Sequence, residues 1–226
     1  MENIEYLLKK TELKNYSEEE ALEILKTECE IHGKDQQLIR CMEEFSELIE
    51  VILEFNIHGR MDYTNLCEEL TDCMICTKVL QILFDIQKTD LNKEWNIYTD
   101  ENLLNNCMLN LTVSSIKISK CLRNRKNADL RIINIINTIR ETIENIIKYF
   151  DINSDDMLGI FKLKIERSNT RNNKYYEKNN INEFIELSNI ETDKMDDIFK
   201  ESIDKTLDNS AGRFIRRYRK KIFIKK

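Results

Sequence analysis

The sequence predicts an all-α fold. The chain of 226 residues contains no proline and only four glycines, so helices are rarely interrupted and β-turn signals are scarce. Hydrophobic residues make up 41% of the chain, which is enough to form a buried core. Long segments repeat their apolar residues with a period near 3.6, which is typical of amphipathic helices. These three observations together predict a helical bundle.

The helices can be placed in order along the chain. Ser17, followed by three glutamates, is typical of a capping box and begins a helix that continues to about Cys29. A break at 31–35 precedes a long helix, and a turn at 58–60 precedes the next. A polar connector follows at 86–100, and the stretch after 172 is polar and rich in asparagine. The remaining helices are expected at about 36–55, 63–84, 101–122, 129–150, 155–171 and 182–207.

An internal repeat divides this pattern into two similar parts. At a constant offset of 66 residues, Cys41-Met42 matches Cys107-Met108, and the Phe-Asp-Ile of 84–86 matches that of 150–152. No gap is needed between these matches. The repeat predicts two copies of one helical hairpin, over 30–86 and 101–152.

Two acidic motifs lie on the first hairpin. Glu44 and Glu47 are three residues apart, as are Glu69 and Asp72, so each pair shares one face of its helix. Helices joined by a short connection are expected to be antiparallel neighbours, which brings the four carboxylates together. Hard divalent cations prefer such oxygen ligands. The sequence therefore predicts a Mg²⁺ site, with Mn²⁺ as a substitute.

An exposed acidic face is the alternative interpretation of these motifs. Both pairs continue the apolar stripes of their helices, however, and therefore flank the core. Arg40 can pair with Glu44, whereas Glu69 and Asp72 have no basic residue three or four positions away. Partly buried carboxylates need a cation or hydrogen-bond donors, and the lack of a basic neighbour on the same helix favours the metal site.

The second hairpin lacks these acids. In place of Glu43, Glu44 and Glu47 it has Leu109, Asn110 and Val113, and in place of Glu69 and Asp72 it has Ile135 and Thr138. We therefore expect one metal site in each chain, with the second hairpin as its degenerate packing partner.

Basic residues gather on the predicted helix 155–171. Lys164, Arg167 and Arg171 share one face of it, an arrangement that suits the oxygens of a polyphosphate. An ordinary exposed basic face is the alternative. The tail 211–226 carries eight Lys or Arg residues and no acid, so it can contact RNA, DNA or an anionic membrane, or dock on the acidic remainder of the chain.

Composition argues against several other classes of protein. The net charge of −6 argues mildly against general nucleic-acid binding, and no apolar run is long enough to span a membrane. The first ten residues lack the apolar core of a signal peptide. Seven cysteines, mostly within helical patterns, indicate reduced thiols and a cytoplasmic location. Cys73 and Cys76 form a lone C-x-x-C, for which we expect two core thiols rather than a zinc site.

These motifs resemble those of a known family. The stretch Gly33-x-x-x-Gln37-Leu38, the E-E-x-x-E of 43–47 and the E-x-x-D of 69–72 are similar to the MazG-like all-α nucleoside triphosphate pyrophosphohydrolases. The K-x-x-R-x-x-x-R of 164–171 resembles the usual ending of a MazG-type domain, although here it follows the second hairpin. The related dimeric dUTPases combine an active and a degenerate half in one chain, as the repeat does here. The resemblance covers about residues 30–172.

The resemblance implies a role for each matching residue. Glu44, Glu47, Glu69 and Asp72 would hold Mg²⁺, and Glu43 or Glu47 would act as the catalytic base. Lys164, Arg167 and Arg171 would contact phosphate, and Gln37 would lie near the base pocket. The chain would form a homodimer, with a MazG-like helical domain over 1–172 and a C-terminal helical extension over 173–226.

The resemblance also implies the activity. The expected reaction is metal-dependent hydrolysis of an NTP or dNTP to the monophosphate and pyrophosphate. One alternative is a narrow activity on dUTP or dCTP. Another is a helical interaction or regulatory protein that keeps the fold without turnover.

Overall fold

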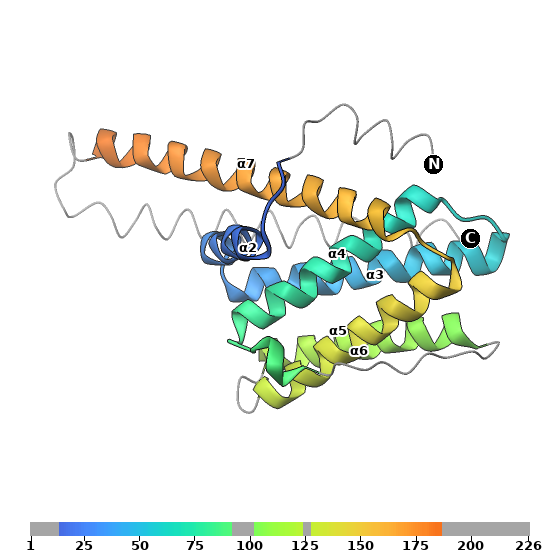
Figure 1. Ribbon diagram of the computed structural model, residues 1–226. Helices are drawn as coiled ribbons and strands as arrows, with labels where there is room; N and C mark the ends of the chain where they lie inside the picture. The colour runs from blue at the N-terminus through green and yellow to red at the C-terminus, as the bar shows by residue number, and fades with distance from the viewer. Residues whose placement is uncertain (1–13, 92–101, 124–127, 187–226) are drawn as a thin grey trace, which may run out of the picture. The chain divides into compact units, whose positions relative to one another are not determined.

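A computed structural model describes residues 14–91, 102–123 and 128–186, and for 128–130 and 180–186 it describes the backbone alone. Every regular element within these ranges is helical, which confirms the all-α fold (Figure 1). None of the helices found there is both long enough and apolar enough to cross a membrane. The elements are α2 (Glu18–His32), α3 (Lys34–His58), α4 (Tyr63–Leu83), η1 (Lys88–Asp90), α5 (Leu103–Arg123), α6 (Ala128–Tyr149) and α7 (Ser154–Glu186).

Local signals set the ends of the early helices. The predicted capping box is confirmed: the Glu20 amide donates to Ser17 Oγ at 3.1 Å, and the Ser17 amide donates to the Glu20 carboxylate at 2.8 Å. The break between α2 and α3 is a single residue, Gly33, at φ 76°. Gly59 ends α3 in the left-handed conformation, at φ 63°, which glycine adopts without steric cost. Asp62 caps α4 by accepting from two backbone amides.

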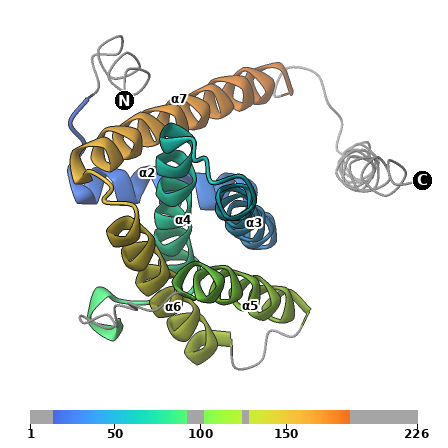
Figure 2. The same cartoon turned by 90° about the vertical axis from the view of Figure 1, so that its right-hand side faces the viewer.

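Four long helices form the main body of the first compact unit. The helix α3 packs on α4, α5 packs on α6, and the two hairpins meet through α3 with α5 and α4 with α6 (Figure 2). Residues related by the 66-residue offset are buried in both hairpins. These pairs are Leu38 and Leu104, Phe45 and Leu111, Ile52 and Ile118, Leu66 and Ile132, Leu70 and Ile136, and Leu80 and Ile146.

The cysteines of the repeat make equivalent hydrogen bonds. Cys41 Sγ donates across the first hairpin to the carbonyl of Cys76 at 3.9 Å. Cys107 Sγ donates across the second to the carbonyl of Thr142 at 4.0 Å. Donor and acceptor both shift by 66 residues, so the helices of each hairpin pair in the same register.

The Phe-Asp-Ile segments end both hairpins in the same turn. Asp85 and Asp151 have φ values of 51° and 50°, in the left-handed region that few residues other than glycine adopt. The following residues, Ile86 and Ile152, are both buried, and their amides donate to carbonyls five residues earlier at 2.9 and 3.0 Å. The sequence match at these positions therefore reflects a shared backbone conformation.

The last described helix is longer than the sequence predicted. The predicted helix end at 171 and the predicted helix start at 182 are wrong, because α7 continues through the asparagine-rich stretch to Glu186. No glycine or proline interrupts 160–186. Asn172 is buried, and its side chain donates to the carbonyl of Ile24 on α2 at 3.0 Å, which satisfies a polar group that the pattern assigned to solvent.

The chain divides into two compact units, Met1–Lys174 and Tyr175–Lys226. In the second unit the structure describes only the end of α7, where the rings of Tyr175 and Tyr176 meet edge to face at 5.9 Å. The predicted basic tail at 211–226 lies outside the described residues, as does most of the predicted helix at 182–207.

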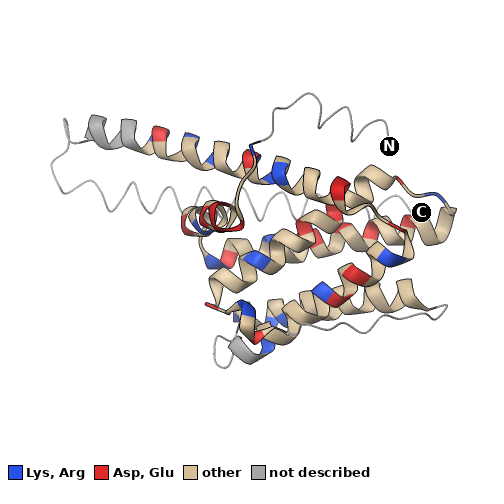
Figure 3. Ribbon diagram, viewed as in Figure 1, with Lys and Arg blue, Asp and Glu red and all other residues tan. Residues whose placement is uncertain are grey.

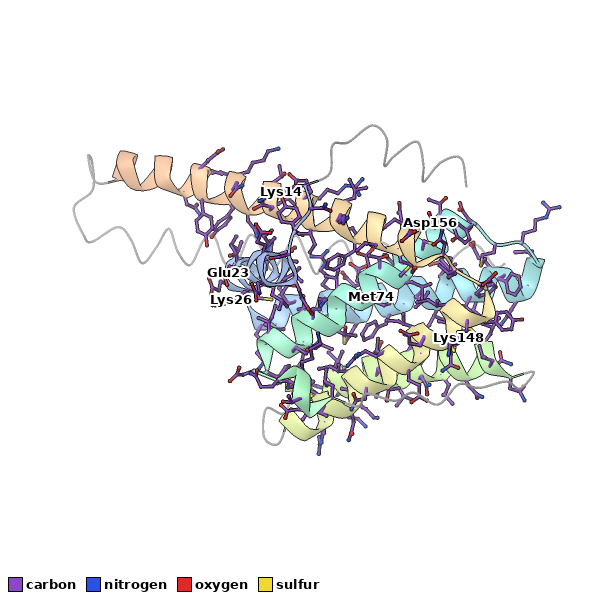
Figure 4. The ribbon with its side chains drawn as sticks, in the orientation of Figure 1. Lys14, Glu23, Lys26, Met74, Lys148 and Asp156 are labelled. Atoms are coloured by element: carbon purple, nitrogen blue, oxygen red, sulfur yellow. The ribbon has the colours of Figure 1, made fainter. Side chains whose placement is uncertain are left out.

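The start of α7 is fastened to the start of α4. Tyr63 donates its hydroxyl to Asp156 at 2.9 Å and accepts from the Asn153 amide at 3.1 Å. Figure 4 shows Asp156 beside this end of α4. This contact fixes where α7 departs from the second hairpin.

We expect Ile52→Ala to lower the free energy of unfolding by about 2–5 kcal/mol, because Ile52 is 1% exposed and its truncation leaves a cavity. Ile57→Ala, on the same helix but 70% exposed, should change it by less than about 0.5 kcal/mol. Urea denaturation of both variants tests the placement of the core. Equal losses would contradict it.

Candidate metal and phosphate site

Three of the four predicted metal ligands form one cluster. Glu44 and Glu47 of α3 and Glu69 of α4 each place a carboxylate oxygen within 4.8 Å of the others. Figure 3 shows acidic residues gathered where α3 and α4 run side by side. The i, i+3 spacing places each pair of acids on one face of its own helix, and the packing of α3 on α4 brings these two faces together.

The fourth predicted ligand, Asp72, has a different neighbour. Its carboxylate forms an ion pair with the ammonium group of Lys164 on α7, and both side chains are mostly buried. The fold therefore places a predicted phosphate-binding lysine directly against the acidic motif of the first hairpin. In this structure Asp72 is not one of the three clustered carboxylates and pairs with α7 instead.

The electrostatics of the cluster disfavour full ionisation. Burial, together with the neighbouring charges of Glu47, Asp72 and Glu44, raises the pKa of Glu69 to about 7. Burial and Asp72 also raise the pKa of Glu44, although Arg40 opposes this by donating to its carboxylate at 3.2 Å. A cation at the cluster would remove the cost of ionising these groups together.

One oxygen of the cluster has no hydrogen-bond partner among the described residues. Glu69 Oε2 is buried and accepts no hydrogen bond from any described residue. Three carboxylates with an unpartnered buried oxygen suit a hard divalent cation such as Mg²⁺. The donor set of the chain is therefore compatible with the predicted metal.

A cavity of about 510 Å³ adjoins the acids, between α3, α4 and α7. All three predicted phosphate-binding residues line it, together with two of the predicted metal ligands. Acids of the first hairpin and cations of α7 therefore share one opening. The lining residues are Arg40, Glu44, Asp72, Ile75, Leu163, Lys164, Glu166, Arg167, Ser168, Thr170 and Arg171.

The part of α7 that lines the cavity is held by contacts with Tyr16, in the segment before α2. Tyr16 donates its hydroxyl to the Glu166 carboxylate and accepts from the Asn169 side chain at 3.2 Å. Burial and the bond to Glu166 raise the pKa of Tyr16. The helix that carries the cations is thus attached by polar contacts to the start of the described chain.

The sequence analysis missed one residue of this site. Glu28 of α2 is 4% exposed and forms ion pairs with Arg40 at 2.6 Å and with Arg171 at 3.5 Å. Only the pairing of Arg40 with Glu44 was visible as an i, i+4 spacing, and the structure confirms it. Nothing in the sequence around Glu28 relates it to residues of α3 and α7.

Other predicted residues lie away from the cavity. Gln37 is 2% exposed, donates its side-chain amide to the carbonyl of Glu28 at 3.3 Å and does not line the cavity. Glu43 is exposed and is not part of the cluster. Cys73 and Cys76 are buried free thiols, as expected of core positions, and burial raises the pKa of Cys73.

The equivalent positions of the second hairpin carry neutral side chains. Asn110, which corresponds to Glu44, donates to the Thr142 hydroxyl at 3.3 Å. Ile135, which corresponds to Glu69, is fully buried. Neutral side chains therefore stand at these two positions of the second hairpin, where the first hairpin has carboxylates.

Comparisons with known proteins add no assignment. No family model, no curated protein and no solved structure matches this chain. The argument for function therefore depends on the geometry of the cluster and the cavity.

The raised pKa of Glu69 predicts how stability depends on pH. Between its ordinary value of 4.5 and about 7, the folded chain keeps a proton that the unfolded chain releases. The free energy of unfolding should therefore fall as pH rises through this window. Glu69→Gln has no carboxyl group to ionise, so it removes this loss. The melting temperature of the variant minus that of the wild type should therefore be larger at pH 8 than at pH 5.

Glu43→Gln is the matched control, because Glu43 is exposed and outside the cluster. Adding Mg²⁺ or Mn²⁺ should raise the melting temperature of the wild type, more at pH 8 than at pH 5, and should do so less in Glu69→Gln. A stabilisation by Glu69→Gln that is the same at both pH values would contradict this account.

Proposed function

We propose that this protein is a Mg²⁺-dependent pyrophosphohydrolase that cleaves an NTP or dNTP to the monophosphate and pyrophosphate. The observation that supports it is the shared cavity, where Glu44 of the carboxylate cluster and Asp72 lie beside Lys164, Arg167 and Arg171. A metal-bound triphosphate needs acids for the ion and cations for the remaining oxygens. The chemistry of the cavity offers both.

The residues can be given roles in this reaction. Glu44, Glu47 and Glu69 would hold the ion, which would neutralise charge on the triphosphate, and Asp72 would join them or remain paired with Lys164. A water molecule attacks the α-phosphorus and forms a new P–O bond. The bond from this phosphorus to the oxygen that bridges the α- and β-phosphates breaks, and pyrophosphate leaves. A carboxylate accepts the proton from that water. Both Glu43 and Glu47 are exposed, and Glu47 is favoured for this step because it belongs to the cluster.

The equivalent bonds of the two hairpins support the proposed architecture. They agree with an all-α pyrophosphohydrolase type in which an active hairpin is followed by a degenerate copy. A narrower activity on dUTP or dCTP is a variant of the same proposal. A non-catalytic interaction protein is the alternative from another class, and the intact acidic cluster argues against it. A cytoplasmic location fits the seven cysteines, of which all are free.

A homodimer is part of the proposal, and an apolar stripe on α5 supports it. Leu109, Val113 and Ile116 are 59%, 36% and 48% exposed and follow one helical face. They stand where the first hairpin has glutamates, so the second hairpin presents apolar surface at positions that are acidic in the first. Such surface is typical of an interface between protein chains.

Hydrolysis can be measured as pyrophosphate release from a panel of NTPs and dNTPs with Mg²⁺ or Mn²⁺. Glu44→Gln and Glu69→Gln should each lower kcat/KM by about 100-fold or more, because each removes charge that holds the ion. Glu54→Gln, an exposed change on the same helix as Glu44, should have little effect. The proposal would be contradicted if the wild type cleaved no nucleotide and if Glu44→Gln bound metal as the wild type does.

Light scattering tests the oligomeric state. The wild type should show twice the chain mass of 27.1 kDa. The double variant Leu109→Glu, Val113→Glu should shift toward the monomer, because it places charges within the apolar stripe. Asn105→Glu, an exposed change on the same helix, serves as the control. A wild-type monomer at high concentration would contradict the dimer.

A further inference from the structure

A buried carboxylate joins two arginines of the candidate site. Glu28 Oε1 accepts from Arg40 Nη1 at 2.6 Å and from Arg171 Nη2 at 3.5 Å. The carboxylate side chain is 5% exposed, whereas those of Arg40 and Arg171 are 34% and 58% exposed. The anion is therefore inside, and both cations reach the cavity that they line.

Arg40 connects this pair to the acidic cluster. Its Nε donates to Glu44 at 3.2 Å while its Nη1 donates to Glu28. Charges thus alternate from α3 to α7 in the order Glu44, Arg40, Glu28, Arg171. An ion held at Glu44 would lie at one end of this series, and the basic face of α7 lies at the other.

The guanidinium of Arg40 retains donors for a ligand. An arginine has five N–H groups, and the two bonds to described carboxylates use one on Nε and one on Nη1. Arg40 lines the cavity beside Arg171, and the planar guanidinium matches the geometry of phosphate oxygens. Two arginines this close repel each other unless an anion lies between them, which is the position of Glu28.

We propose that Arg40 is a further phosphate-binding residue of this site, and that Glu28 is the positioning residue that holds Arg40 and Arg171 as a pair for adjacent phosphate groups. This inference rests on the proposed function, because it assigns these residues to the triphosphate of the same substrate. It adds α2 to the elements that build the site.

Tripolyphosphate binding, measured by calorimetry in EDTA, tests Arg40 without metal or turnover. Arg40→Gln should weaken binding by about tenfold, since one charge-assisted contact is lost. Arg40→Lys should fall between this variant and the wild type, because it keeps the charge without the planar fork. Lys26→Gln, an exposed change on α2, is the control. In turnover, Arg40→Gln should raise KM for the nucleotide.

Glu28→Gln separates positioning from simple charge. The substitution removes a negative charge from the cavity wall, so charge alone predicts tighter binding of tripolyphosphate. Positioning predicts weaker binding, since the two arginines lose the carboxylate that orients them. Weaker binding supports the proposal, and equal or tighter binding overturns the role of Glu28. The double variant Arg40→Gln, Glu28→Gln leaves no unpaired buried charge from this pair and checks the loss at Arg40 in a folded protein.

The outcomes distinguish this inference from the proposed function. Nucleotide hydrolysis by the wild type, with normal KM and normal tripolyphosphate affinity in Arg40→Gln, overturns the inference alone. Arg40-dependent binding of tripolyphosphate without any hydrolysis supports the phosphate subsite and overturns the pyrophosphohydrolase. A wild type that neither hydrolyses nucleotides nor binds tripolyphosphate overturns both.

Discussion

The packing of α3 against α4 brings Glu44, Glu47 and Glu69 so close that their negative charges repel, and one of their oxygens has no partner in the part of the chain that the structure describes. Basic residues in the rest of the candidate site partly balance this negative charge. Lys164 pairs with Asp72 from one side, and Arg40 pairs with Glu44 from another. These cations leave a cluster whose full ionisation is disfavoured, as the raised pKa of Glu69 indicates.

The cations reach the acids because α7 is guided along the first hairpin. Polar contacts at Tyr63, Tyr16, Glu28 and Ile24 fasten successive turns of it to α4, the segment before α2, and α2 itself. The basic residues follow the second hairpin in sequence but adjoin the acids of the first in space. The candidate site thus combines side chains of the first hairpin with side chains of α7.

The repeat shows which features belong to the fold and which to the site. Buried positions, the Cys41 and Cys107 bonds and the left-handed Asp85 and Asp151 recur in both hairpins, because both need the same packing and the same turn. The acids occur in one hairpin only. Their replacement by Asn110 and Ile135 leaves the packing intact, so packing does not require them.

The sequence by itself determined the helices, the repeat and the two carboxylate pairs, because each depends on spacing within 25 residues or on direct self-similarity. It missed the length of α7, since Asn172 is satisfied by a carbonyl of α2 that no local pattern announces. Only the tertiary structure decided that Lys164 meets Asp72, that Gln37 faces Glu28 rather than the cavity, and that Glu28 joins two arginines. Such contacts link residues up to 143 positions apart, and side-chain pairing at that separation follows from how helices pack rather than from the order of residues.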